Sequence, residues 1–200
     1  MRSVLISIQP KWCELIANGS KTIEVRKTKP KLDTPFKVYI YCTKSKKHFL
    51  QSRSNMFFYC EDKDFIGGHG AGAYQRLNGK VIGEFVCNCI SVTTWCSNVT
   101  PSSLKEFYNE ETCLTDKEVW EYTKGKSFYE WHISNLVIYD KPKELSELYR
   151  WCYSGCDNCD NQCWKHSAGD KELICIVENK KPITRPPQSW CYVESLGNAQ

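Results

Sequence analysis

The feature that most constrains the fold of this sequence is a short stretch, residues 18–26, where a helix pattern changes directly into a strand pattern. Pro10 suits the first turn of a helix, where its missing N–H costs nothing, and apolar residues share one face across 10–17. Gly19 stands where a helix end favours a positive φ. Polar and apolar side chains then alternate through residues 22–26, which predicts a strand with one buried face.

The same stretch brings Lys21, Glu24 and Arg26 within six residues of one another. Strict alternation would place Lys21 on the apolar face, so we expect it at the mouth of the strand, where the chain still turns. Charges spaced in this way often form only a solvated ion pair of little energetic value. If water is excluded, the pKa of the lysine falls and its neutral amine can act as a base. If the charges persist, Lys21 and Arg26 can donate to a phosphate or a carbonyl, and Glu24 can accept from an amine.

Size and composition limit the class of protein. Two hundred residues, 41% of them hydrophobic, suit one domain with large insertions. No apolar window is long enough to cross a membrane, and the apolar run at residues 4–8 is too short for a signal peptide, so we expect a cytoplasmic protein. The net charge of +4 permits a polyanionic partner without requiring one.

The remaining elements are short and show no β–α–β rhythm. This pattern predicts an α+β chain with a small β-barrel and short flanking helices. We expect strands over 4–8, 36–43, 80–95, 131–133, 136–139, 173–177 and 190–193, and further helices over 102–108, 115–125 and 142–151.

Residues 44–80 form an insertion in which the periodic pattern fails, up to a turn signal at 78–79. Basic residues there mix with the aromatic run at 56–59, a combination typical of proteins that bind single-stranded nucleic acid. A glycine-rich run at 67–72 lacks the signature of a phosphate-binding loop, so we interpret it as a flexible loop.

The chain has 13 cysteines, an odd number, and nothing in it directs export. Several lie in expected strands and are most simply small buried side chains. A compact knuckle within 150–170 has the spacing C-x3-C-x2-C-x3-C, which suits a tetrahedral structural Zn²⁺ site. Disulfides, free thiols or an iron–sulfur cluster are the alternatives. The expected metal ligands are Cys152, Cys156, Cys159 and Cys163.

Residues 19–26 resemble the G-x-K-x-x-E-x-R signature of ASCH domains, a branch of the PUA-like superfamily, and residues 9–12 resemble the start of the preceding helix in that family. The resemblance implies a single domain over 1–200, built as a pseudo-barrel with a cleft beside the first helix and the signature strand. Three further segments resemble phage- and prophage-encoded ASCH proteins of Gram-positive bacteria, namely 80–84, 131–133 and 185–193.

This resemblance implies an RNA- or nucleotide-binding module that recognises a base or a modified nucleoside in that cleft. Base recognition would combine hydrogen bonds with stacking on aromatic side chains. The substrate-binding residues expected from the resemblance are Trp12, Lys21, Glu24, Arg26, Ser189 and Trp190.

Two alternatives stay open. Some ASCH proteins are amidohydrolases that remove acyl groups from N4-acylated cytosine nucleosides, and others are reported to cleave RNA. The resemblance then implies a catalytic Lys21, with Glu24 where those amidohydrolases carry threonine, and a proton-shuttling glutamate at Glu110 or Glu111. The other alternative is a mobile-element protein that binds a host protein through residues 44–80.

Overall fold

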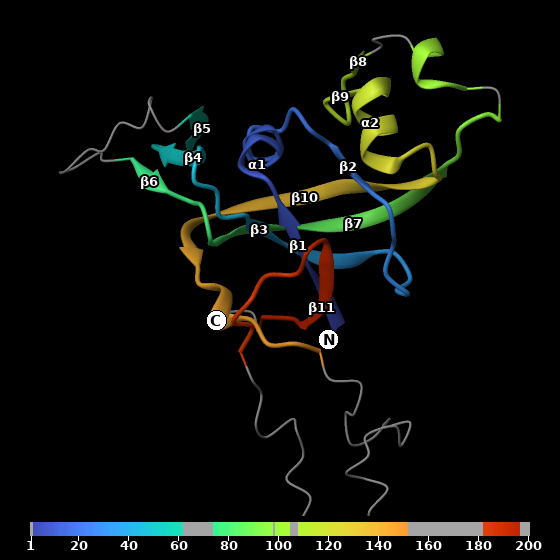
Figure 1. The fold of residues 1–200 in the computed structure, drawn as a ribbon. Coiled ribbons are helices and arrows are strands. Elements are labelled where there is room, and N and C mark those ends of the chain that lie inside the picture. Colours follow the sequence, from blue (N-terminus) through green and yellow to red (C-terminus); the bar gives the residue numbers. More distant parts are fainter. Residues whose placement is uncertain (1, 62–73, 98, 105–107, 152–181, 197–200) are drawn as a thin grey trace, which may run out of the picture.

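A computed structural model of the chain describes residues 2–61, 74–97, 99–104, 108–151 and 182–196. Its centre is a six-stranded sheet in the order β11-β1-β3-β7-β10-β2, in which only β1 and β3 run parallel (Figure 1). The strands of this sheet are β1 (Arg2–Ile8), β2 (Ile23–Arg26), β3 (Phe36–Cys42), β7 (Val81–Thr93), β10 (Phe128–Lys143) and β11 (Trp190–Glu194). The helices α1 (Pro10–Ala17) and α2 (Asp116–Thr123) lie on the same side, with β2 between them (Figure 1).

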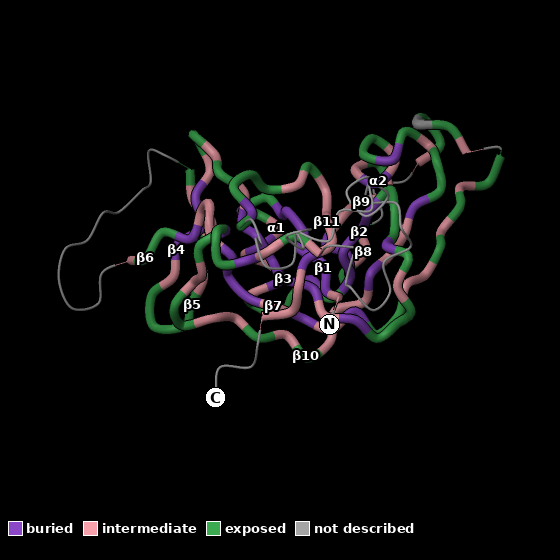
Figure 2. Tube along the Cα trace, turned by 90° about the horizontal axis from the view of Figure 1, so that it is seen from below, coloured by how far each residue is buried: buried purple, intermediate pink, exposed green. Residues whose placement is uncertain are grey.

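Strands β1 and β3 of the sheet are buried on both faces. In β3, Phe36, Val38 and Ile40 join one apolar cluster, while Tyr39 and Tyr41 join a second cluster on the opposite face. The strand expected over 36–43 is confirmed, and both of its faces are packed. The buried positions run through the middle of the sheet, along β1 and β3 (Figure 2).

The two edge strands of the sheet are β11 and β2. Among the described strands they make no backbone ladder with each other. Arg26 of β2 donates from Nη2 to the carbonyl oxygen of Ser7 at 2.7 Å and from Nη1 to Oγ of Ser189 at 3.4 Å. The predicted α+β class is therefore confirmed, and the expected barrel is an open sheet. The Arg26 guanidinium connects β2 to the end of β1 and to the residue just before β11.

The insertion at 44–80 contains regular structure that sequence analysis missed. A three-stranded sheet in the order β5-β4-β6 is formed by β4 (His48–Arg53), β5 (Met56–Glu61) and β6 (Gln75–Arg76). The first two strands are joined by Ser54 and Asn55, both with positive φ (51° and 61°), as a tight hairpin turn requires. Ser-Asn is a weaker turn signal than Asn-Gly, so the sequence does not predict this hairpin. The glycine-rich run lies outside the described residues.

Three element predictions for the second half of the chain are corrected. The two strands expected between 131 and 139 are one strand, β10, because irregularities shift its pairing with β7 without ending it. The helix expected over 142–151 is only a 3₁₀ turn, Leu145–Glu147, and the one expected over 102–108 is a 3₁₀ turn, Pro101–Ser103, followed by the short pair β8 (Tyr108–Asn109) and β9 (Leu114–Thr115). The strand expected over 173–177 lies outside the described residues.

Helix α2 begins as its sequence predicts. Thr115 is the N-cap, its hydroxyl accepts from the Glu118 N–H at 3.2 Å, and the Glu118 carboxylate accepts from the Thr115 N–H at 2.8 Å. This reciprocal pair satisfies two helix-end donors. The helix ends at Lys124, which is left-handed with φ 57°.

A pair of bridges closes the base of the segment that connects β10 to β11. Tyr149 forms an antiparallel bridge with Pro182, and Arg150 forms one with Val193 of β11. The chain therefore leaves the sheet and returns to it at neighbouring points. No helix in the described part of the chain has the length and apolar character needed to cross a membrane.

Gly83 provides a test of how tightly β7 packs against the bulged part of β10. A Cβ added there would overlap the carbonyl oxygen of Val137 and lie 3.0 Å from Cδ1 of Ile138. We expect Gly83→Ala to lower the free energy of unfolding by about 1–3 kcal/mol, measured by urea denaturation, because two paired backbones must separate. Asn88→Ala, at an exposed position of the same strand, should change it by less than about 0.5 kcal/mol. Equal midpoints for the two variants would contradict the packing described.

Candidate functional site

A cleft of about 520 Å³ opens between α1, β2 and α2. Its volume lies within the range of sites that hold small molecules, roughly 300–1,000 Å³. Five segments of the chain form its walls, which means that the site depends on the tertiary fold. The lining residues are Ser7, Ile8, Gln9, Trp12, Lys21, Glu24, Val25, Arg26, Thr43, Leu114, Glu118, Glu121, Tyr122, Gln188 and Ser189.

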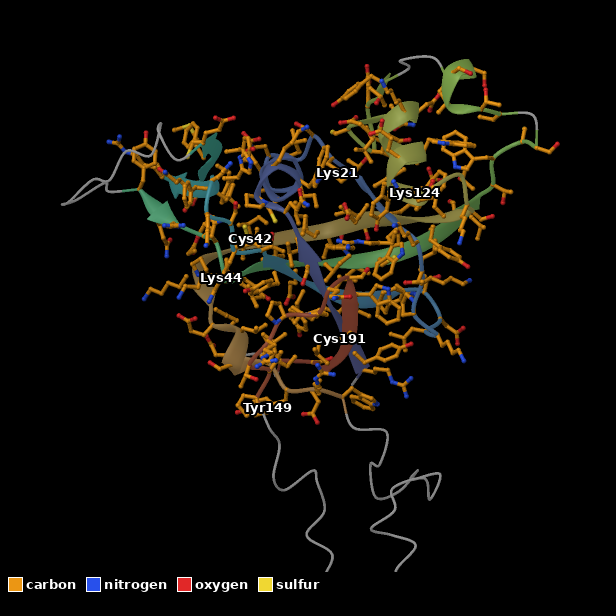
Figure 3. The ribbon with its side chains drawn as sticks, viewed as in Figure 1. Lys21, Cys42, Lys44, Lys124, Tyr149 and Cys191 are labelled. Carbon is orange, nitrogen blue, oxygen red and sulfur yellow. The ribbon has the colours of Figure 1, made fainter. Side chains whose placement is uncertain are left out.

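Lys21 lines this cleft and lies between α1 and α2 (Figure 3). It stands two residues before β2, at the mouth of the strand as expected, and it is only 2% exposed. Its Nζ donates to the carbonyl oxygen of Thr112 and lies 3.6 Å from Oε2 of Glu24. The ring centre of Trp12 is 5.4 Å from the same nitrogen. Burial lowers the pKa of Lys21, and the negative charge of Glu24 only partly opposes this shift.

Glu24 and Arg26 share one face of β2 and form a buried ion pair. Oε1 of Glu24 lies 2.9 Å from Nη2 of Arg26, and each side chain is 9% exposed. All four residues of β2 are buried, so the prediction of a single buried face is wrong, and so is the alternative of a solvated ion pair. Nε of Arg26 is buried and has no hydrogen-bond partner among the described residues. An unpaired buried donor costs about 1–3 kcal/mol, so a ligand oxygen that reached it would be stabilised.

The opposite wall comes from α2, and sequence analysis did not assign it to the site. Glu118, Glu121 and Tyr122 line the cleft at positions i, i+3 and i+4, which is one face of a helix. The capping box at the start of α2 was visible in the sequence, but nothing local indicated that the helix packs beside β2. The spacing of these three side chains was the one available signal.

The two glutamates expected to shuttle protons lie elsewhere. Glu110 and Glu111 have exposed side chains and are absent from the cleft lining. The backbone of this segment supports the site instead, because the Glu111 carbonyl accepts from the N–H groups of Thr22 and Ile23, both at 2.9 Å. Lys21 also donates from Nζ to the carbonyl oxygen of Thr112, and the three hydrogen bonds together attach residues 110–112 to the start of β2.

Of the remaining predicted site residues, Trp12 and Ser189 line the cleft and Trp190 does not. The Trp190 ring packs at 6.1 Å from that of Trp131, and its Nε1 donates to Oγ1 of Thr28 at 3.0 Å. Trp190 therefore fixes the segment that carries Ser189.

The four cysteines of the predicted zinc knuckle, Cys152, Cys156, Cys159 and Cys163, lie outside the described residues. Within the described ranges, no three His, Cys, Asp or Glu side chains are grouped in a way that could hold a metal ion. Structural zinc in the knuckle stays a prediction, and the cleft itself has no metal-binding group among the residues seen.

The charges in the cleft nearly balance. Two basic side chains, Lys21 and Arg26, face three acidic ones, Glu24, Glu118 and Glu121. Such a lining does not favour a phosphate group, which needs an excess of donors. It suits a neutral polar molecule that presents both donors and acceptors, with an aromatic surface for Trp12 or Tyr122.

Comparison with known proteins identifies relatives of the chain. The family described as "ASCH domain" matches residues 6–143. No curated protein sequence matches significantly. The crystal structure of ASCH from Zymomonas mobilis is similar at 16% identity, covering 96% of this chain and 88% of that one with a TM-score of 0.49. A mutant of the same protein is 17% identical over 72% of this chain and 76% of that one, with a TM-score of 0.44.

Proposed function

This chain belongs to the ASCH domain family, and we propose that its cleft binds one unpaired base of single-stranded RNA. The family is a PUA-like one of RNA-binding modules. The observation that carries the proposal is the adjacent donor and acceptor on β2, where Arg26 has a buried Nε without a described partner and Glu24 lies 2.9 Å from its Nη2.

The pattern of donors and acceptors fits the edge of a base that has an exocyclic amine. Glu24 would accept from the amine, and Arg26 or Lys21 would donate to a ring nitrogen or carbonyl oxygen of the same base. Glu118 contributes less, because its carboxylate already accepts from the N–H and hydroxyl of Thr115, at 2.8 and 3.0 Å. Uracil lacks the amine, so we propose a preference for cytosine, adenine or guanine.

Aromatic side chains on the two walls support the same proposal. Trp12 of α1 is half-buried and Tyr122 of α2 is 39% exposed, and both line the cleft. A flat neutral base placed there could stack on either ring while its edge faces β2. Stacking of a base on an aromatic side chain is worth about 1–3 kcal/mol.

The test is binding of short single-stranded RNAs and of free nucleosides, measured by fluorescence. We expect Trp12→Leu to weaken binding about tenfold by removing one stacking surface. Tyr108→Leu is the matched control, since Tyr108 is an exposed aromatic residue on β8 outside the cleft lining. Equal affinities for wild type and Trp12→Leu, or a preference for uracil, would overturn the proposal.

A second candidate, hydrolysis of an N4-acylated cytidine or of RNA, is favoured by the buried Lys21, whose pKa is lowered. A lysine with a lowered pKa has a larger neutral fraction, which can take a proton from water. Oε2 of Glu24 lies 3.6 Å from Nζ of Lys21, and Glu121 is a further carboxylate in the cleft lining. The test is mass spectrometry of wild-type and Lys21→Ala protein incubated with N4-acylated cytidines and with short single-stranded RNAs. Product formed by wild type and absent with Lys21→Ala makes the protein an enzyme, and intact bound ligand leaves it a binding module.

A further inference from the structure

The whole net charge of the protein resides in the 44–80 insertion. This segment has seven basic and three acidic residues, and the rest of the chain has 20 of each, so the segment alone accounts for the net +4. The cleft, by contrast, has more acidic than basic side chains. A polyanion that used the cleft would therefore be attracted mainly by the neighbouring insertion.

The strand pairing in the insertion places aromatic and basic side chains on one face of its sheet. Gln51 of β4 pairs with Phe58 of β5 on one side and with Arg76 of β6 on the other, so these three residues form a row across the strands. Arg53 and Met56 form the next row on the same face. Gln51 itself is buried at 3% exposure, so only the other residues of these rows can meet a ligand. We call the surface formed by Arg53, Met56, Phe58 and Arg76, with Tyr74 beside it, the outer face of the small sheet.

The other face of the small sheet packs against α1. Phe57 is partly buried against the main core, and its carbonyl oxygen accepts from Nδ2 of Asn18, just after α1, at 3.2 Å. The aromatic side chains of the outer face are therefore not needed to attach the sheet to the domain.

The outer face has the chemistry of a stacking platform. Phe58 is 39% exposed and meets the Tyr74 ring edge-on, with the centroids 6.0 Å apart. The guanidinium carbon of Arg53 lies 5.5 Å from the centre of the Tyr74 ring, and Met56 is 55% exposed. Exposed aromatic rings beside guanidinium groups are the means by which proteins bind single-stranded nucleic acid without base-specific contacts.

We propose that the outer face of the small sheet binds the nucleotides that flank the base in the cleft. Bases stack on Phe58 and Tyr74, and Arg53 neutralises a phosphate. Lys11, exposed on α1 with its Nζ 4.4 Å from the centre of the Trp12 ring, adds a positive charge on the helix between cleft and small sheet. The choice of RNA as the partner rests on the proposed function. The cleft would then hold a base, and the phosphate contacts that its lining does not favour would be made by the outer face of the small sheet.

The test compares a short single-stranded RNA with a free nucleoside, each titrated at several salt concentrations by fluorescence anisotropy or quenching. Phe58→Leu keeps the apolar side chain but removes the ring, and we expect about tenfold weaker RNA binding with unchanged nucleoside binding. Phe58→Tyr should bind as wild type does. Arg53→Gln should reduce the slope of log K against log salt by about 0.7, the value for one phosphate contact on a single strand.

Two controls lie on the main sheet. Lys141→Gln removes one exposed charge from β10, and Val92→Ala trims a side chain of β7 that is 57% exposed, and neither should alter RNA binding. If Phe58→Leu and Arg53→Gln bind RNA as tightly as wild type, the platform is overturned while the cleft stands. If these variants weaken RNA binding and Trp12→Leu does not, the platform stands and the proposed function of the cleft fails. Wild-type protein that binds no RNA overturns both.

Discussion

We expect Glu24→Gln to lower the free energy of unfolding by about 3–5 kcal/mol, because it leaves buried positive charge without its counter-ion. Glu24 lies between Lys21 and Arg26, at 3.6 and 2.9 Å from their nitrogens, and its side chain is 9% exposed. Glutamine has nearly the same shape, so the loss reports charge and not volume. Small domains are stable by only about 5–15 kcal/mol, so this one change removes a large part of the total.

The measurement is urea denaturation with Glu144→Gln as the matched control. Glu144 is also in an ion pair, with Lys80, but its side chain is 58% exposed, and such pairs contribute about 0–1 kcal/mol. Similar losses for the two variants would show that water screens the Glu24 charge. A double variant, Lys21→Met with Glu24→Gln, should lose less than the two single variants together, because removing the lysine removes a cation that needed Glu24.

The pH dependence of the same experiment has a definite sign. Burial lowers the pKa of Lys21 in the folded state from its ordinary value of 10.5, so between the two values the unfolded chain binds more protons. The contribution of Lys21 to stability therefore rises as pH rises through this window, and it is least favourable below it. The charge of Glu24 opposes the lowering of the Lys21 pKa, so Glu24→Gln should lower this pKa further and widen the pH range over which stability rises. Part of the free energy of unfolding that the variant loses should therefore be recovered in alkaline solution.

The second large effect is expected at Trp131, near the start of β10. This side chain is 0% exposed, and its ring meets Phe36 edge-on at 5.9 Å and lies 6.1 Å from Trp190. We expect Trp131→Ala to lower the free energy of unfolding by about 3–5 kcal/mol, because the fixed strands around it cannot collapse into the space left.

Trp131→Phe separates packing from hydrogen bonding. The Nε1 atom of Trp131 is buried without a hydrogen-bond partner among the described residues, so removing it leaves no group unpaired. The phenylalanine variant should therefore lose less than about 1.5 kcal/mol by the same denaturation experiment. Equal losses for the alanine and phenylalanine variants would indicate that the indole nitrogen, and not the ring, holds the strands together.

Local signals predicted the first part of the fold well. Pro10 begins helix α1 and Gly19 follows its end with a positive φ, as expected, and the strand expected over 36–43 is β3. The capping box at Thr115 also begins a helix as expected. Each of these features depends on residues within one turn or one strand, which sequence patterns report directly.

The site was predicted only in part, because half of it comes from distant segments. The sequence brings Lys21, Glu24 and Arg26 together on its own, but their burial depends on backbone carbonyl groups near Thr112 and on α2. No periodicity reports such contacts. The small sheet was missed for a different reason, since its hairpin turn uses Ser-Asn in place of a residue pair with a stronger turn preference.

The bridge between Tyr149 and Pro182 has a consequence for how this protein can vary. Because the two ends of the connection are held next to each other, the entropy lost on closing it depends only weakly on its length, at about 0.6 kcal/mol for each doubling. Insertion or deletion between these two residues should therefore leave the register of β10 and β11 unchanged. We therefore expect the length of the cysteine-rich connection to be variable without a change in the strand pairing beside the cleft.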